Sequence, residues 1–161
     1  MDGAIDRLAV LAGRLGHVNT QENMNEFRTA IDKEVKLMVD AGLAALREGL
    51  AGAGVWRDSV VVVASEFGRE VAINGTQGSD HGTGGAAFVL GGAIRGGRVL
   101  ADWPGLAKKD RFEGRDLRIT TDLRAVWRCI LDQHLQVGRA ALDTQVLPGT
   151  ADLPRLDLLR A

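Results

Sequence analysis

The sequence predicts an α/β fold in which a mostly parallel sheet is flanked by helices. Apolar residues recur at helical spacing from Asn25 to Leu50, with charged residues between them, which predicts one long amphipathic helix or two shorter ones meeting near Gly42. The segment Ser59 to Ala64 holds four consecutive valines, and such a β-branched run is typical of a central parallel strand covered on both faces. A helix followed by a buried strand is typical of α/β proteins.

Both ends of the helix-to-strand unit have recognisable boundaries. Glycines stand at positions 52 and 54, where we expect the helix to end. Beyond the valine run, the apolar segment Ala86 to Leu90 predicts a second strand. Gly91 to Leu100 is rich in glycine and predicts a turn with a short hairpin, and Leu117 to Thr120 predicts a further short strand.

The C-terminal third begins with a second helix. Asp122 is suited to an N-cap, so we expect a helix from Leu123 to about Leu135. The single cysteine, Cys129, lies in this apolar helical run and is interpreted as a small buried thiol. Residues 138–161 contain two prolines and predict a mostly irregular tail, within a single domain that spans residues 1–161.

Composition narrows the class of protein. The 161 residues are 45% hydrophobic and 25% charged, as is ordinary for a globular protein. A formal net charge of -1 provides no field that would hold nucleic acid or an acidic membrane, so we expect neither as a partner. No apolar run approaches the roughly 18 residues of a membrane span, and the first residues lack the pattern of a secretory signal, so we expect a soluble chain.

Candidate metal ligands follow the first predicted strand. Glu66 comes just after the valine run, and Asp80 and His81 lie in the next polar loop. Ligands of open α/β sheets gather at the carboxyl ends of the strands, and a carboxylate with an imidazole suits zinc or a similar divalent ion. A purely structural interpretation stays open, in which Asp80 caps a turn, His81 hydrogen-bonds in its loop and Glu66 pairs with an arginine.

Arginines near these residues predict contacts with an anion. Arg69 can hold two oxygens of a phosphate or sulfate group at once, although a salt bridge to Glu66 is the alternative. Arg95 and Arg98, between glycines, are interpreted either as anion contacts or as parts of a solvated hairpin. Ser65 lacks the flanking glycines of a nucleophile elbow, so serine-hydrolase chemistry is not expected.

An ordered series of motifs resembles one bacterial family. The series is Ser65-Glu66-Phe67-Gly68-Arg69, Asp80-His81-Gly82, Gly91-Gly92-Ala93-Ile94-Arg95-Gly96-Gly97-Arg98, Asp102-Trp103-Pro104-Gly105, Gly114-Arg115-Asp116-Leu117 and Thr121-Asp122-Leu123-Arg124. From about Asn19 to Leu153 the chain is similar to the C-terminal half of DUF1501 proteins, of the alkaline phosphatase and sulfatase superfamily. The resemblance implies an alkaline phosphatase-like fold and a metal-dependent phosphatase or sulfatase, with Glu66 and His81 at metal-holding positions.

The same resemblance predicts what is missing. The N-terminal half of such folds, which holds the nucleophile and further ligands, is expected to be absent here. Family members resemble exported proteins with a twin-arginine signal, which implies an exported or periplasmic location. Where the family has an Asp-Thr-His triplet that resembles a metal-binding pair, this chain has Asn19-Thr20-Gln21, and neutral amides are poor ligands for a transition metal.

Two functions therefore remain open. One is a metal-dependent hydrolase of phosphate or sulfate esters, which the intact Asp80-His81-Gly82 loop favours. The other is a noncatalytic remnant or accessory domain that acts by binding protein, which the Asn19-Thr20-Gln21 triplet favours. A truncated sheet would leave an unpaired strand edge, so we expect self-association or a separate chain that completes the sheet.

Overall fold

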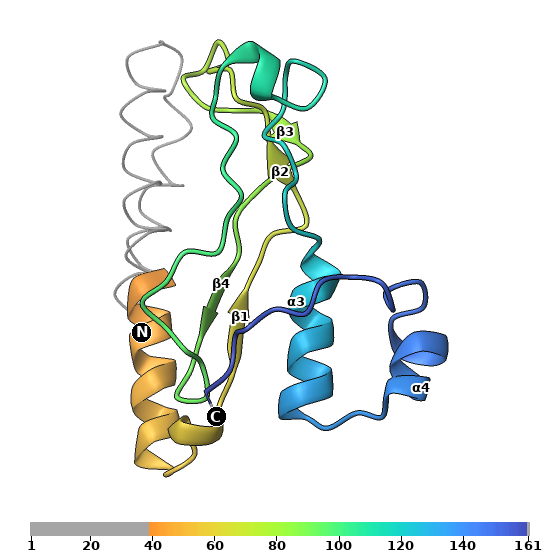
Figure 1. Cartoon of the computed structure of the whole chain (residues 1–161). Coiled ribbons are helices and arrows are strands. Elements are labelled where there is room, and N and C mark those ends of the chain that lie inside the picture. The colour runs from red at the N-terminus through yellow and green to blue at the C-terminus, as the bar shows by residue number, and fades with distance from the viewer. Residues whose placement is uncertain (1–38, 161) are drawn as a thin grey trace. The chain divides into compact units, whose positions relative to one another are not determined.

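A computed structural model describes residues 39–160 of the chain (Figure 1). It divides into two compact units, with the boundary between Val55 and Trp56, and each unit is considered by itself. Residues 39–52 of the first unit are helical. The Asn19-Thr20-Gln21 triplet, and the part of the predicted 25–50 helix before residue 39, lie outside the described residues.

The helix of the first unit ends as the glycines predict. After residue 52 the chain turns, and Gly54 adopts a φ of 74°, in the left-handed region that glycine reaches without strain. The amide of Val55 donates to the carbonyl oxygen of Leu50 at 2.9 Å, which closes the last turn. Across residues 39–160, none of the helices combines the length and the hydropathy needed to cross a bilayer.

The second unit, residues 56–160, mixes short helices with two small sheets (Figure 1). In chain order its elements are η2 (Trp56–Asp58), β1 (Val61–Val63), β2 (Gly68–Arg69), β3 (His81–Gly82), β4 (Phe88–Leu90), η3 (Lys108–Asp110), α3 (Leu123–Cys129), η4 (Ile130–His134), α4 (Arg139–Ala141) and η5 (Leu142–Val146).

Both sheets are antiparallel, which differs from the mostly parallel sheet that the sequence predicts. Strand β1 pairs with β4, with Val62 opposite Val89, and β2 pairs with β3. A parallel return usually needs a crossover helix, but residues 64–87 form the β2–β3 pair and its loop instead, so β4 runs back beside β1. Within residues 39–160 we find no parallel pair, and the valines of β1 are half-buried rather than covered on both faces.

Two other predicted strands take different forms. In place of a hairpin, Gly91 begins a tight turn in which the amide of Ile94 donates to its carbonyl oxygen at 3.2 Å, and Ile94 then forms an isolated bridge with Leu159. Residues 117–120 are not a strand; the neighbouring Asp116 forms isolated bridges to Glu70 and Phe112. These segments pair with distant parts of the chain, which a local pattern does not reveal.

The predicted C-terminal helix is confirmed. It begins at Leu123 as α3 and continues as the π-helical η4 to His134, and the Asp122 side chain accepts a hydrogen bond from the Arg124 amide at 2.8 Å as the N-cap. Cys129 is buried, as predicted, and desolvation raises the pKa of its thiol. Residues 139–146 are helical as well, where the sequence predicts a mostly irregular tail.

The buried residues of the second unit gather mainly on these helices. Ala125 and Cys129 of α3, Ile130 of η4 and Leu142 of η5 are each at most 6% exposed. A polar bridge holds the helices together, because the Arg128 guanidinium lies 2.6 Å from Asp143 and donates to the Thr150 hydroxyl at 3.0 Å. The core is small, so each of its apolar members matters for stability.

Candidate functional site

The β2–β3 pair brings three of the four predicted site residues together. Arg69 of β2 lies directly opposite His81 of β3 in the antiparallel register, and Asp80 precedes His81. The amide of Glu70 donates to the carbonyl oxygen of Asp80 at 2.9 Å, and the amide of Arg69 donates to that of Gly84 at 2.8 Å. Side chains that face each other across a strand pair lie within reach of one another, so a cation and an imidazole are neighbours here.

The two strands approach closely because glycine occupies the crowded positions. A Cβ atom added at Gly82 would lie 2.5 Å from the carbonyl carbon of Arg69, and one at Gly68 would lie 2.3 Å from that of Thr83. At Gly84 the nearest atom would be the carbonyl oxygen of Leu117, at 2.4 Å. A side chain at any of these positions would push backbone away from backbone.

A third segment braces the pair from the other side. The amide of Leu117 donates to the carbonyl oxygen of Arg69, and that of Val71 donates to the carbonyl oxygen of Arg115, each at 3.0 Å. Between them, Asp116 is 2% exposed and accepts from Arg115 Nε at 2.7 Å. This hydrogen bond holds the pKa of the Asp116 carboxyl below its ordinary value of 3.8, although desolvation opposes the shift.

Replacing Asp116 by asparagine should lower the Tm at pH 7 by a few degrees. Because the native pKa is depressed, the carboxylate contributes stability above its unfolded value of 3.8, and this stability is lost as the pH falls through the native pKa. Thermal unfolding followed by circular dichroism between pH 7 and pH 3 should show the deficit of Asp116→Asn shrinking at the acidic end. A deficit that stays constant over this range would mean that the charge of Asp116 does not stabilise the brace.

His81 is held by aromatic stacking rather than by a hydrogen bond. Its ring lies against Phe67, with centroids 4.2 Å apart and planes 12° from parallel. His81 is exposed, and within the described part of the chain its side chain forms no hydrogen bond. Stacking engages the face of the imidazole and leaves both nitrogens at the ring edge, where a metal or an acceptor would bind.

Asp80 is fixed by its own loop. Its Oδ1 accepts a hydrogen bond from Asn74 Nδ2 at 2.8 Å. The other side of the Asn74 amide accepts from the backbone amides of Thr76 and Gly78, at 3.1 and 2.9 Å, and Gln77 completes the turn with a φ of 61°. The loop therefore orients Asp80 through Asn74 and leaves the second carboxylate oxygen exposed.

Glu66 is not gathered with the other candidates. It is exposed, and in residues 39–160 no ion pair joins it to Arg69, so the predicted salt bridge between them is not formed there. Nor do three or more histidine, cysteine, aspartate or glutamate side chains come close enough within this range to hold a metal ion together. The geometry offers Asp80 and His81 as a pair, with Arg69 opposite.

Comparison with known proteins identifies the family. A family model described as "Protein of unknown function (DUF1501)" matches residues 17–128. The chain belongs to the DUF1501 family. No curated protein and no solved structure matches it. The DUF1501 match confirms the resemblance at the level of the family and includes β1 to β4 with all four predicted site residues, whereas most of the helical region from η4 onward lies beyond it.

Two residues of this DUF1501 site were missed by the sequence analysis. Phe67 supports the imidazole of His81, and Asn74 orients Asp80. Asn74 precedes a glycine in a polar loop, which is a recognisable turn signal. Nothing local to Phe67 indicates stacking on a residue fourteen positions later, because that contact depends on the β2–β3 register.

Proposed function

We propose that this chain carries part of the active site of a metal-dependent hydrolase of phosphate or sulfate esters. In this proposal Glu66, Asp80 and His81 are ligands of a divalent metal, of which zinc suits them best, and Arg69 contacts the anionic group of the substrate. The observation that carries the proposal is the β2–β3 register, which sets Arg69 opposite His81 with Asp80 beside it.

The available atoms suit this chemistry. The edge of the His81 ring and one oxygen of Asp80 form no hydrogen bond within the described residues, so lone pairs are available to a cation. The planar guanidinium of Arg69 can hold two oxygens of a phosphoryl or sulfuryl group. A bound divalent ion would polarise an oxygen of the same group. The resemblance to exported superfamily members supports an exported or periplasmic location.

The residues now described would not complete the coordination by themselves. Structural zinc sites have four protein ligands and catalytic sites commonly three, whereas here Asp80 and His81 are the only close pair and Glu66 stands apart within residues 39–160. The proposal therefore requires Glu66 to move toward the pair, or a further ligand from outside these residues. This requirement makes metal content the decisive measurement.

Zinc should bind with one-to-one stoichiometry, and the His81→Ala variant should lose at least about tenfold in zinc affinity, since each ligand contributes substantially. Titration calorimetry and elemental analysis of the purified chain measure both quantities. The control is His134→Ala, which removes a histidine from η4. The pair Asp80→Asn and Asp152→Asn applies the same test to the carboxylate. Equal zinc binding by wild type and His81→Ala would remove the basis of the proposal.

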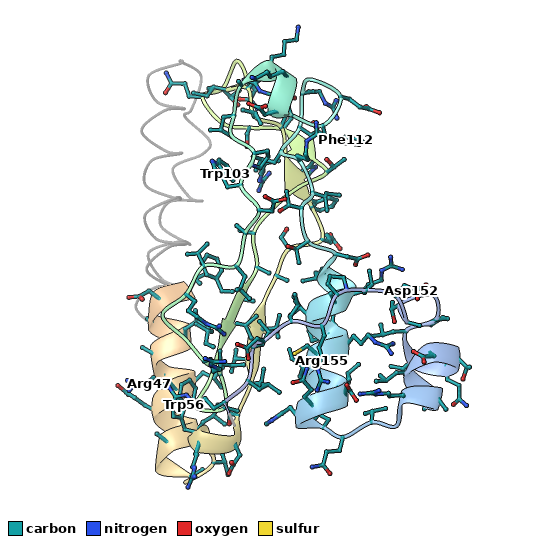
Figure 2. All side chains as sticks on the ribbon, viewed as in Figure 1. Arg47, Trp56, Trp103, Phe112, Asp152 and Arg155 are labelled. Carbon is teal, nitrogen blue, oxygen red and sulfur yellow. The ribbon has the colours of Figure 1, made fainter. Side chains whose placement is uncertain are left out.

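A second function, noncatalytic protein binding, is favoured by exposed apolar side chains. Phe88 of β4 is 63% exposed, Trp103 65% (Figure 2) and Val99 90%. Strands β1 and β4 pair only with each other among the described residues, so each has an edge with free hydrogen-bonding groups. Analytical ultracentrifugation tests this candidate: concentration-dependent dimers that Trp103→Ser weakens would support it, and a monomer at every concentration would count against self-association.

A further inference from the structure

A groove lies where the C-terminal segment returns to the turn after β4. The amide of Arg95 donates to the carbonyl oxygen of Leu158, and the amide of Arg160 donates to that of Ala93, each at 2.8 Å, on either side of the bridge between Ile94 and Leu159. Figure 1 shows the C-terminus reaching this end of the β1–β4 pair. Both segments belong to the second unit, so their pairing is part of one compact body.

The groove encloses about 650 Å³ and has a charged wall. It is lined by Arg95, Gln133, Asp157, Leu159 and Arg160. Its volume falls in the range typical of small-molecule sites, which runs from about 300 to 1,000 Å³. It is larger than a single inorganic anion requires, so an organic molecule would fit.

Positive charge predominates at the groove. Both Arg95 and Arg98 bind the single carboxylate of Asp157, and Arg98 also donates to its carbonyl oxygen. Arg160 uses Nε to donate to the carbonyl oxygen of Ile94 at 2.9 Å, and its two terminal nitrogens form no hydrogen bond within the described residues. Hydrogen bonding from Arg95 holds the pKa of Asp157 below its ordinary value, so at neutral pH three guanidinium groups face one carboxylate.

The pairing of Arg95 with Asp157 is open to exchange. The side chains are 51% and 63% exposed, and ion pairs at such positions are screened by water and contribute little. A phosphate group has the same geometry of oxygens as a carboxylate but more charge, and it binds guanidinium groups bidentately. A ligand of this kind could take the place of Asp157 beside Arg95 while also contacting Arg160.

We propose that this groove binds a small organic phosphate, with Arg160 and Arg95 contacting its oxyanion and Leu159 contacting its apolar part. Asp157 acts as an internal anion that the ligand displaces from Arg95. The site is separate from the proposed metal site, since it uses neither Arg69 nor His81. Success or failure here is therefore independent of the hydrolase proposal.

The test uses the full chain with phenyl phosphate and inorganic phosphate as probes, at constant ionic strength set with sodium chloride. Calorimetry should give tighter binding of phenyl phosphate, and NMR should place the shift changes at the amides of residues 93–95 and 158–160. Arg160→Gln should raise the Kd about tenfold, the effect of one charge-assisted contact. Arg139→Gln, which removes an exposed arginine of α4, is the control and should leave the Kd unchanged.

Asp157→Asn provides the opposite change. It removes the competing negative charge, so the Kd for phenyl phosphate should fall, with a Tm close to that of the wild type showing that the groove is intact. Arg69→Gln should leave this Kd unaltered. An unchanged Kd in folded Arg160→Gln, a weaker binding in folded Asp157→Asn, or shift changes that occur away from both segments would overturn the proposal.

Discussion

The Leu142→Ala variant is expected to lower the free energy of unfolding by about 2–5 kcal/mol. Leu142 is 0% exposed, and it lies in η5, close to the polar bridge between Arg128 and Asp143. Truncation removes apolar surface from the core and leaves a cavity that the surrounding helices fill only in part. Because the described chain has few buried apolar residues, little remains to compensate. Urea unfolding, followed by circular dichroism, measures the change.

The matched control is Val146→Ala, in the same element. Val146 is 48% exposed, so its truncation should cost less than about 1 kcal/mol. Intrinsic fluorescence follows the same transition with a contribution from Trp127 of α3, which would show whether the helices unfold together. Similar losses for the two variants would mean that η5 does not pack through Leu142, and the arrangement of α3, η4 and η5 would need revision.

Leu142 also illustrates why local patterns misjudge the tail. Two prolines and a glycine near residues 148–154 favour irregular structure, and the segment before them carries too few apolar residues for a strong helical pattern. Its helix is supported by distant partners, since Arg128 of α3 binds Asp143 and Thr150. By contrast, α3 is predictable because its N-cap, Asp122, acts on an amide two residues away.

Strand existence was predictable, but strand direction was not. The valine run and the segment before Gly91 do contain β1 and β4, because β-branched and apolar runs favour strands wherever they pair. Whether two strands run parallel depends on how the chain returns. Residues 64–87 return through the short β2–β3 pair, and no periodicity in the valines of β1 encodes that path.

The candidate site divides in the same way. Residue types and order identified Arg69, Asp80 and His81 as chemically suited groups, and the register brings them together. The sequence could not show that Glu66 stands apart from them, because Phe67 intervenes and turns its ring onto His81. Residue chemistry is therefore predictable from a single sequence, whereas the set of groups that meet is decided by backbone pairing.

Backbone pairing at the site should be most sensitive to Gly82. We expect Gly82→Ala to destabilise the chain by about 3 kcal/mol, at the upper end of the usual cost of overpacking. The new methyl group would lie 2.5 Å from the carbonyl carbon and 2.7 Å from the carbonyl oxygen of Arg69, and a carbonyl cannot rotate away as a side chain can. Relief requires β2 and β3 to separate, which carries Arg69 away from His81.

The control is Gly75→Ala in the loop between the same strands, where no atom lies within 4 Å of an added Cβ. Its unfolding free energy should stay within about 1 kcal/mol of the wild type. If the proposed metal site depends on the β2–β3 register, zinc affinity should fall in Gly82→Ala at temperatures where the chain is still folded and stay unchanged in Gly75→Ala. A stable Gly82→Ala variant would mean that the strands are further apart than described, and Arg69 would then no longer be positioned by His81.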